Sequence, residues 1–339
     1  MLRYTEELSS LNGVSGNEDD VRKYIISAID GKCEYHTDNL GNLIVFKKGK
    51  KTPEKKLMIA AHMDEVGLIV TYINSDGTLC FDTVGGVNAD VVAGRQVVIC
   101  KNGLKGVVGS KAVHNMSDSE RKESVKVSKL CIDIGATSKE EAEKYVALGD
   151  FVSFSPGFTR LGNERICSKA LDDRIGCAIM IDMINKEPEY DIYFAFTVQE
   201  EIGLRGSSTA AFAIAPDFAI VLETTTASDI SAVSGAQRVC ELGKGAVVSY
   251  MDRRTIYDKE LYELCFTVAK ENNIACQTKT MVAGGNDSGA IHISGKGVRT
   301  IAISAPCRYL HSPSCVADTK DIDACGKLVN LLVPRIFEL

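Results

Sequence analysis

The order of apolar and polar positions divides this chain into three parts. In the first and last parts, short apolar runs typical of buried strands alternate with segments of helical periodicity. The middle part holds short β-rich runs separated by Gly, Asn and Asp turns, the pattern of a small all-β barrel or sandwich. We therefore predict an α/β domain formed by residues 1–68 and 161–339, interrupted by an inserted β-rich domain of residues 69–160.

The pattern also places individual elements. Continuous apolar runs predict buried strands, and we expect them at residues 57–61, 191–198, 217–223 and 299–304. A further strand is expected at residues 275–281. Helices are expected where apolar residues recur at helical spacing, at residues 173–185, 207–213, 258–272 and 319–336. A shorter helix is expected inside the insert at residues 138–148, where Ser138 and Glu141 have the spacing of a capping box.

Composition narrows the class of protein. The chain has 339 residues and a net charge of −6, which argues against nucleic acid as a partner because phosphate binding requires a basic face. No apolar run reaches the ~20 residues that span a bilayer, and the first residues lack the apolar core of a signal peptide. The 12 cysteines form no CxxC pair, so we expect them to be reduced. We therefore expect a cytoplasmic protein that binds neither nucleic acid nor membranes.

Candidate chemistry begins with two adjacent carboxylates, Glu200 and Glu201, directly after the predicted strand at 191–198. Ligands of open α/β sheets bind at such strand ends. Four further features occupy equivalent places at strand ends or in the following loops: His62 with Asp64, Asp172 with Asp173, Glu223, and His311.

Two histidines and several carboxylates without cysteine form a ligand set suited to two divalent ions such as zinc, cobalt or manganese. In a His-x-Asp pair, the Asp64 carboxylate can hold the second nitrogen of His62 and orient the ring. In the adjacent pair, one of Glu200 and Glu201 can bind metal while the other remains free as a base. Each feature alone also has a structural explanation, since helix caps and strand ends are often acidic.

The motifs AAHMDEVG, ALDDRIG, FTVQEEIGLRG and RYLHSP, together with the acidic strand end before TTTASD, resemble in order and spacing the M42 family of metallo-aminopeptidases. This group includes tetrahedral and glutamyl aminopeptidases, and some members are labelled endoglucanases. The resemblance covers essentially the whole chain. It implies a mixed-sheet α/β/α metallopeptidase domain with an inserted β-barrel that mediates self-association, and a homododecamer built from dimers.

The resemblance also implies residue roles. One ion would be held by His62, Asp172 and Glu223, and a second by Asp172, Glu201 and His311. Glu200 would be the general base that activates a water, and Asp64 would orient His62. Many members have Asp where this chain has Glu223, a departure that affects the first ligand set.

Bridging aspartates of related peptidases are followed by a cis peptide bond. The resemblance therefore predicts that the bond between Asp172 and Asp173 is cis and that Asp173 is turned away from the ions.

The expected reaction is removal of N-terminal residues from short peptides. Carboxylates outnumber the charges of two divalent ions, which favours a substrate ammonium over a substrate carboxylate. The alternatives are a related metal deacylase or carboxypeptidase, a glycoside hydrolase that uses Glu200 and Glu201, and a scaffold without activity. Gly284–Asp287 is expected to line the substrate cleft, and His114 of the insert is expected at the surface or at a subunit contact.

Overall fold

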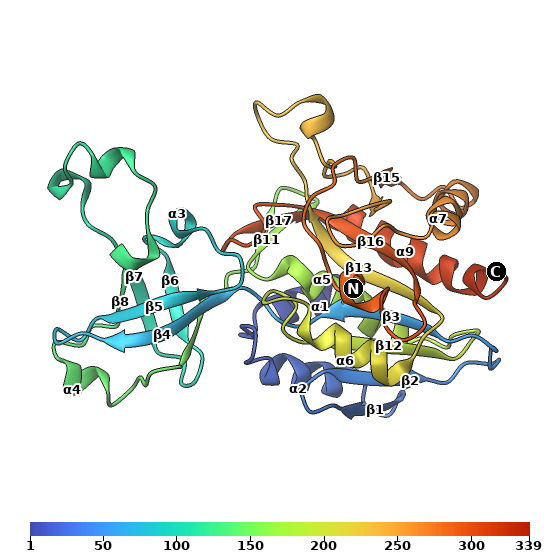
Figure 1. Ribbon diagram of the computed structural model, residues 1–339, viewed down its shortest axis with the longest axis horizontal. Coiled ribbons are helices and arrows are strands. Elements are labelled where there is room, and N and C mark those ends of the chain that lie inside the picture. The colour runs from blue at the N-terminus through green and yellow to red at the C-terminus, as the bar shows by residue number, and fades with distance from the viewer.

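The chain forms an α/β domain from which a β-barrel projects to one side (Figure 1). The computed structural model describes the backbone of residues 1–339 and every side chain except those of Val113 and Glu120. The fold class predicted from the sequence is confirmed: a mixed sheet covered by helices, with a barrel inserted between two of its segments.

The large sheet combines parallel and antiparallel strands. Its main path runs β1-β2-β12-β3-β13-β16-β17-β11-β10, with β14 paired to β16 and β15 to β14. The strands are β1 (Glu34–Thr37), β2 (Leu43–Lys47), β3 (Leu57–His62), β10 (Thr159–Leu161), β11 (Arg165–Ser168), β12 (Ile192–Thr197), β13 (Phe218–Thr226), β14 (Ala246–Val248), β15 (Cys276–Thr278), β16 (Arg299–Arg308) and β17 (Cys315–Asp318). Its centre is the parallel set β12, β3, β13 and β16. Every residue of β3 is buried, as expected for a strand covered on both faces.

Helices cover the sheet in two groups (Figure 1). α5 packs with α1 and α9, whereas α6 packs with α8. The helices of this domain are α1 (Leu2–Ser9), α2 (Asp19–Ala28), α5 (Leu171–Ile184), α6 (Arg205–Ile214), α7 (Lys259–Glu271), α8 (Ser288–Ile291) and α9 (Thr319–Ile336), with a 3-10 turn η4 (Gly235–Gln237). Asp318 precedes α9, and its side chain accepts a hydrogen bond from Lys320 N and so caps the helix.

The insert is a closed antiparallel barrel of order β4-β5-β8-β7-β6-β9. Its strands are β4 (Gly67–Ile73), β5 (Leu79–Val84), β6 (Gln96–Ile99), β7 (Lys105–Gly109), β8 (Cys131–Asp133) and β9 (Phe151–Phe154). Short helical pieces connect them: α3 (Ala89–Val92), η1 (Val113–Asn115), η2 (Glu120–Lys122), η3 (Val127–Lys129) and α4 (Lys139–Ala142). The barrel has its own apolar core, separate from the core of the large sheet.

Two sequence expectations differ from the observed elements. The helix expected at 138–148 is only α4, although Ser138 does cap it by accepting a hydrogen bond from Glu141 N at 3.3 Å. The strand expected at 275–281 is only β15, which pairs with β14 alone. Among the helices that the structure describes, none is both long and apolar enough to cross a membrane.

Candidate metal centre

The residues singled out from the sequence converge at one edge of the large sheet. β3 ends at His62, and Thr197 of β12 lies opposite it in the parallel register. The Glu200–Glu201 pair follows in the turn after β12, and Glu223 lies on β13. Parallel strands direct their carboxyl ends to the same edge, so the sheet brings together side chains that are distant in the sequence.

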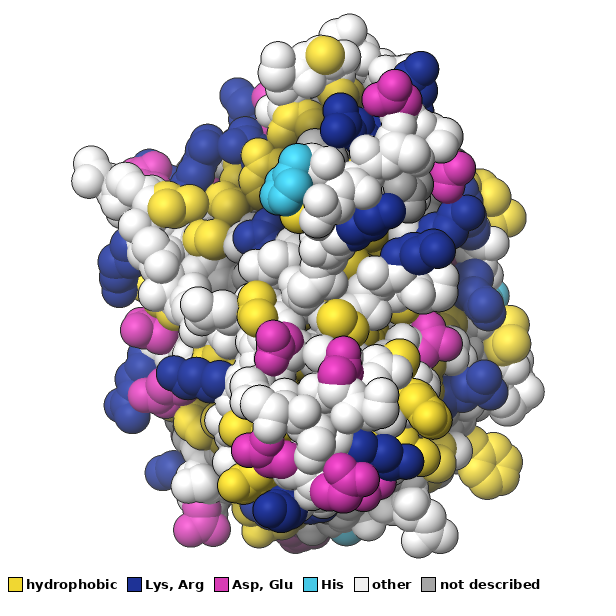
Figure 2. Space-filling model, turned by 90° about the vertical axis from the view of Figure 1, so that its left-hand side faces the viewer, with side chains coloured by type: hydrophobic (Ala, Val, Ile, Leu, Met, Phe, Trp, Pro, Cys, Tyr) yellow, Lys and Arg dark blue, Asp and Glu magenta, His cyan; other side chains and the backbone are white. Residues whose placement is uncertain are grey.

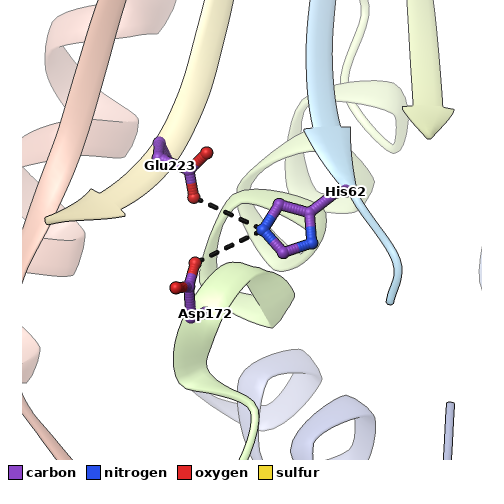
Figure 3. Close-up of side chains that lie close together, drawn as sticks. All are labelled: His62, Asp172 and Glu223. Carbon is purple, nitrogen blue, oxygen red and sulfur yellow. Dashed lines mark ion pairs between the residues drawn. The ribbon is translucent and has the colours of Figure 1, made fainter. Parts of the chain in front are cut away.

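The first group comprises His62, Asp172 and Glu223, whose side chains point toward one another from β3, α5 and β13 (Figure 3). The Nε2 atom of His62 lies 3.3 Å from Asp172 Oδ1 and 3.5 Å from Glu223 Oε1. All three residues are buried. One nitrogen and two carboxylate oxygens therefore face a common point.

The second group comprises Asp172, Glu201 and His311. The Nε2 atom of His311 lies 3.5 Å from Asp172 Oδ2 and 3.3 Å from Glu201 Oε2. His311 lies in the loop between β16 and β17, and its Nδ1 is 3.1 Å from the main-chain oxygen of Gly86. Gly86 follows β5, so the inserted segment helps to orient this histidine.

Asp172 is shared by the two groups, with one carboxylate oxygen directed to each histidine. The peptide bond between Asp172 and Asp173 is cis, as predicted. Asp173 belongs to neither group, because its Oδ1 accepts a hydrogen bond from Gly176 N at 3.0 Å. The sequence prediction that Asp173 turns away is thus confirmed.

The tautomers of the two histidines indicate what the groups can hold. Each ring directs Nδ1 at a main-chain oxygen, that of Asp64 for His62 and that of Gly86 for His311, both at 3.1 Å. When Nδ1 donates its hydrogen in this way, Nε2 presents a lone pair. In the neutral rings these lone pairs face the carboxylate oxygens across 3.3–3.5 Å, so either a proton on Nε2 or a bound cation must lie between them. This arrangement favours a cation between them.

The charges lead to the same conclusion. Burial and the neighbouring Asp172 raise the pKa of Glu223 to about 8 and that of Glu201 to about 7. The contact with Asp172 raises the pKa of His311 to about 10. Burial opposes the charge of Asp172, yet His311 and His62 hold its pKa well below the usual range. The carboxylates of the two groups thus carry more negative charge than the two histidines can neutralise, as expected of a site that binds cations.

The donor set fits divalent metal ions. Asp172 Oδ1 is buried without a hydrogen-bond partner among the described residues, although buried carboxylate oxygens are normally paired. Imidazole nitrogens and carboxylate oxygens, without thiolates, suit zinc, cobalt or manganese. Each ligand histidine also has the main-chain acceptor on Nδ1 that fixes metal-binding rings.

Asp64 is fully buried and does more than the sequence predicted for it. Its carboxylate lies 3.4 Å from His62 Nδ1, but its two oxygens accept hydrogen bonds from Glu200 N at 3.0 Å and Glu201 N at 3.1 Å. Ser15 donates a third hydrogen bond at 2.6 Å. Asp64 thus supports the main chain of the turn that carries both glutamates.

Two further side chains support the same turn. Glu18 Oε1 accepts a hydrogen bond from Gln199 N at 3.2 Å, and Asn42 Oδ1 accepts one from Val198 N at 3.0 Å. Gln199 has a positive φ of 57°, a conformation that a non-glycine residue holds only with support from its surroundings. Every main-chain N–H from Val198 to Glu201 therefore donates to a side chain from elsewhere in the chain.

A buried ion pair lies beneath the centre. Lys169 Nζ donates to both carboxylate oxygens of Glu65, at 2.6 and 2.8 Å, and to Leu11 O at 2.6 Å. The same carboxylate accepts hydrogen bonds from Gly13 N and from Ser153 of the barrel strand β9. This pair joins the N-terminal segment, the end of β3, the barrel and the approach to α5.

Sequence reasoning missed Glu18, Asn42, Glu65 and Lys169 as supports of the centre. Glu65 directly follows the His62–Asp64 motif and Lys169 lies three residues before Asp172, so proximity to the motifs was the available signal. Glu18 and Asn42 carried no such signal.

The centre opens into a cleft of about 180 Å³. The cleft is lined by both ligand groups, by Glu200 and by the turn Gly284–Asn286. The sequence predicted that Gly284–Asp287 lines a substrate cleft; residues 284–286 line the cleft beside the ligand groups, and Asp287 is not among its lining residues. His114 is exposed in the barrel, as expected.

Comparison with known proteins identifies the family. The sequence model of a family described as M42 glutamyl aminopeptidase matches residues 41–328. The chain belongs to the M42 peptidase family. M42 peptidases are metal-dependent aminopeptidases, so the family assignment supports hydrolysis at peptide N-termini.

Individual M42 relatives match along their length. The lysyl aminopeptidase of Pyrococcus furiosus is 35% identical over 333 residues, with 96% of this chain and 94% of the relative covered. The structure of aminopeptidase APDkam598 from Desulfurococcus kamchatkensis matches with a TM-score of 0.93 at 33% identity, covering 98% of this chain and 94% of that one.

A third M42 relative is informative about assembly. The Pyrococcus horikoshii TET1 peptidase, described as able to assemble into a tetrahedron or a large octahedral shell, matches with a TM-score of 0.86 at 33% identity and 98% coverage of both chains. The family description specifies glutamyl substrates and the P. furiosus relative lysyl ones, so membership alone leaves the preferred residue open.

Proposed function

We propose that this protein is an aminopeptidase with a dinuclear metal centre that removes N-terminal residues from short peptides. His62, Asp172 and Glu223 hold one divalent ion, and Asp172, Glu201 and His311 hold the other. The observation that carries the proposal is that the two ligand groups share Asp172, with one of its oxygens directed to each group. Zinc or cobalt suits this donor set best, and manganese is also compatible.

Two ions held by these groups would supply Lewis-acid chemistry, polarising a scissile carbonyl and acidifying a water. Glu200 lines the cleft but belongs to neither ligand group, so its carboxylate is left to accept the proton of that water and pass it to the leaving amine. Asp64, Glu18 and Asn42 aim Glu200 by holding the main chain of its turn. Burial raises the pKa of Glu200 well above its usual value, which suits a group that exchanges protons.

Acidic side chains in the cleft also explain the choice of the peptide N-terminus. A free α-amine is positively charged or a hydrogen-bond donor, and it can bind to carboxylates that the ions leave uncompensated. A deacylase or carboxypeptidase would hold a substrate carboxylate with a cation, and Lys279 is the only Lys or Arg among the described residues that line this cleft. Cleavage of aminoacyl anilides, which lack a carboxylate terminus, would distinguish an aminopeptidase from these enzymes. A glycoside hydrolase needs two facing carboxylates without metal, whereas here Glu201 lies within a ligand group.

Two conservative variants test the assignment. Glu200→Gln should lower kcat by about 10²–10⁴-fold, because a positioned base contributes that much, while both ions remain bound. Glu201→Gln should lose about one of the two ions, measured as metal content after dialysis. Equal metal loss in both variants would show that the roles are misassigned, and activity that survives removal of all metal by EDTA would exclude the proposed mechanism.

We also propose that the inserted segment, residues 69–160, is a separate domain that mediates self-association into a homododecamer built from dimers. Two observations support this proposal: the barrel has its own apolar core and projects from the α/β domain (Figure 1), and related TET peptidases form tetrahedral assemblies. A variant that lacks the barrel should sediment as a smaller species than the full chain. An unchanged assembly size would contradict this role.

A further inference from the structure

The two ligand histidines differ in how firmly the fold holds them. His62 ends the buried strand β3 and its side chain is 2% exposed, whereas the side chain of His311 is 38% exposed. His311 lies in the loop of residues 309–314 between β16 and β17, where Tyr309 and His311 have positive φ values of 59° and 55°. A non-glycine residue keeps such a conformation only when its surroundings hold it. The position of His311 therefore depends on how its loop is anchored.

Arg308, the last residue of β16, anchors the start of this loop through an ion pair with Asp229. Its guanidinium donates from Nε to Asp229 Oδ1 at 2.6 Å and from Nη2 to Asp229 Oδ2 at 2.7 Å. Both side chains are mostly buried, at 18% and 8% exposed. Two parallel hydrogen bonds between a guanidinium and a carboxylate fix the orientation of the pair as well as its separation.

The carboxylate of Asp229 is fully engaged in this contact. Its Oδ2 also accepts a hydrogen bond from Leu242 N at 3.0 Å. Burial opposes the charge of Asp229, yet the hydrogen bonds from Arg308 and Leu242 N hold its pKa below the usual value. Removing the guanidinium would therefore leave a buried negative charge without its partner.

The ion pair joins the two strands that carry one ligand of each group. Glu223 of the first group lies on β13, and His311 of the second group follows β16. Every residue of β13 is paired with β16 in parallel register, and Ala227 N, just beyond β13, still donates to Cys307 O at 2.8 Å. The ion pair extends this connection past the last main-chain hydrogen bond, at the edge of the sheet where the ligands meet.

The same ion pair holds the base of a projecting segment. After β13 the chain leaves the α/β domain as a long loop before it returns to β14 (Figure 1). Asp229 at the start of this loop and Leu242 near its end are tied together through the Asp229 carboxylate. The main chain around Asp229 is thus fixed from two sides, which makes it a firm support for Arg308.

We propose that Arg308 and Asp229 are positioning residues that hold the second ion through His311, a role that rests on the proposed function. The main-chain oxygen of Gly86 sets the rotation of the His311 ring through Nδ1. The ion pair sets the position of the main chain that carries the ring. Without it the loop can leave its positive-φ conformation, and Nε2 then no longer faces Asp172 and Glu201. The first ion should be spared, because His62 lies on a buried strand.

The test measures binding of zinc to the full-length protein by competition with a chelating dye. Arg308→Met should weaken one of the two ions by about 10- to 100-fold, the range for loss of a residue that orients a metal ligand, and leave the other ion unchanged. Asp229→Asn should weaken the same ion. Arg308→Lys keeps the charge without the two parallel hydrogen bonds, so its loss should be smaller.

A double variant identifies the affected site. His311→Ala removes a ligand of the second group and should leave one tightly bound ion. Adding Arg308→Met to His311→Ala should not weaken that remaining ion, because the ion pair acts only through His311.

The matched control is Arg299, at the other end of the same strand. Its Nε donates to Asp258 Oδ2 at 2.7 Å and its Nη2 to Asp258 Oδ1 at 3.0 Å, so it forms the same kind of ion pair. Arg299→Met should lower the resistance to urea, as Arg308→Met does, but should leave the affinity for both ions unchanged.

The results that overturn the inference are distinct from those that overturn the proposed function. If Arg308→Met binds both ions as tightly as the wild type, or weakens both equally, Arg308 and Asp229 do not position His311, while the dinuclear centre stands. If Arg308→Met weakens the ion that remains in His311→Ala, the ion pair acts on the first group instead. A wild type that binds fewer than two ions would refute the proposed function and, with it, this role of the ion pair.

Discussion

Asp64 offers the sharpest test of how the turn with the two glutamates is held. Its oxygens serve different donors: Oδ1 accepts from Glu200 N, and Oδ2 accepts from Glu201 N and from the Ser15 hydroxyl. Asp64→Asn keeps the size of the side chain but replaces one acceptor oxygen by a donating amino group. In either orientation of the amide, that amino group faces a main-chain N–H that cannot reverse its role.

The expected cost follows from these contacts. The variant loses one hydrogen bond to a charged group, worth about 1.5–3 kcal/mol, and leaves a buried N–H without a partner, which costs about 1–3 kcal/mol. We therefore expect Asp64→Asn to lower the free energy of unfolding by about 2–5 kcal/mol. A turn that moves to relieve the clash displaces Glu201, so metal affinity should fall by about 10- to 100-fold.

Glu18→Gln is a matched control because it also converts a buried carboxyl group that supports the same turn into an amide. Gly16 N and Gln199 N both donate to a single oxygen of Glu18, Oε1. The carbonyl oxygen of glutamine can accept both hydrogen bonds, so this variant should unfold within about 1 kcal/mol of the wild type near pH 5. Urea denaturation of both variants and competition with a chelating dye measure the two quantities.

The reasoning fails if Asp64→Asn is as stable as Glu18→Gln and binds metal as tightly. Such a result would mean that the turn keeps its conformation without the two main-chain contacts. Asp64 would then act only through His62, as the family resemblance implied.

Two further predictions concern buried charges. Lys169→Met should lower the free energy of unfolding by about 3–5 kcal/mol, because it leaves the buried Glu65 carboxylate without its closest partner. Urea denaturation measures this change, with Lys244→Met, a substitution of an exposed lysine, as the control. A decrease in the free energy of unfolding of less than about 1 kcal/mol would contradict the prediction. Burial raises the pKa of Glu18 from 4.5 to about 7, so the folded protein holds this proton more tightly than the unfolded chain and stability declines as pH rises from 4.5 through 7. At about 1.4 kcal/mol for each pKa unit, the wild type should lose about 3 kcal/mol more than Glu18→Gln between pH 4.5 and pH 8, and parallel stability curves would refute the assignment.

Local patterns in the sequence were sufficient to predict the amphipathic terminal helix and the central strands, which are apolar along their length. The terminal helix α9 spans the predicted residues 319–336, and β3, β12, β13 and β16 lie where apolar runs predicted buried strands. The residues of the two ligand groups were also identifiable from the sequence. Apart from Asp172, which lies at the start of α5, they lie on or after such strands, and parallel strands end at one edge of a sheet.

Only the tertiary structure decided how these residues are held and what faces them. The hydrogen bond from Gln199 N to Glu18 joins positions 181 residues apart, and that from Val198 N to Asn42 spans 156 residues. His311 Nδ1 contacts the main-chain oxygen of Gly86, which is 225 residues away in the sequence. Lys279, which directly follows β15, lines the cleft. Contacts of this kind leave no periodic trace in the sequence, because a single side chain that meets a distant main-chain atom follows from the packing of whole elements and not from local propensity.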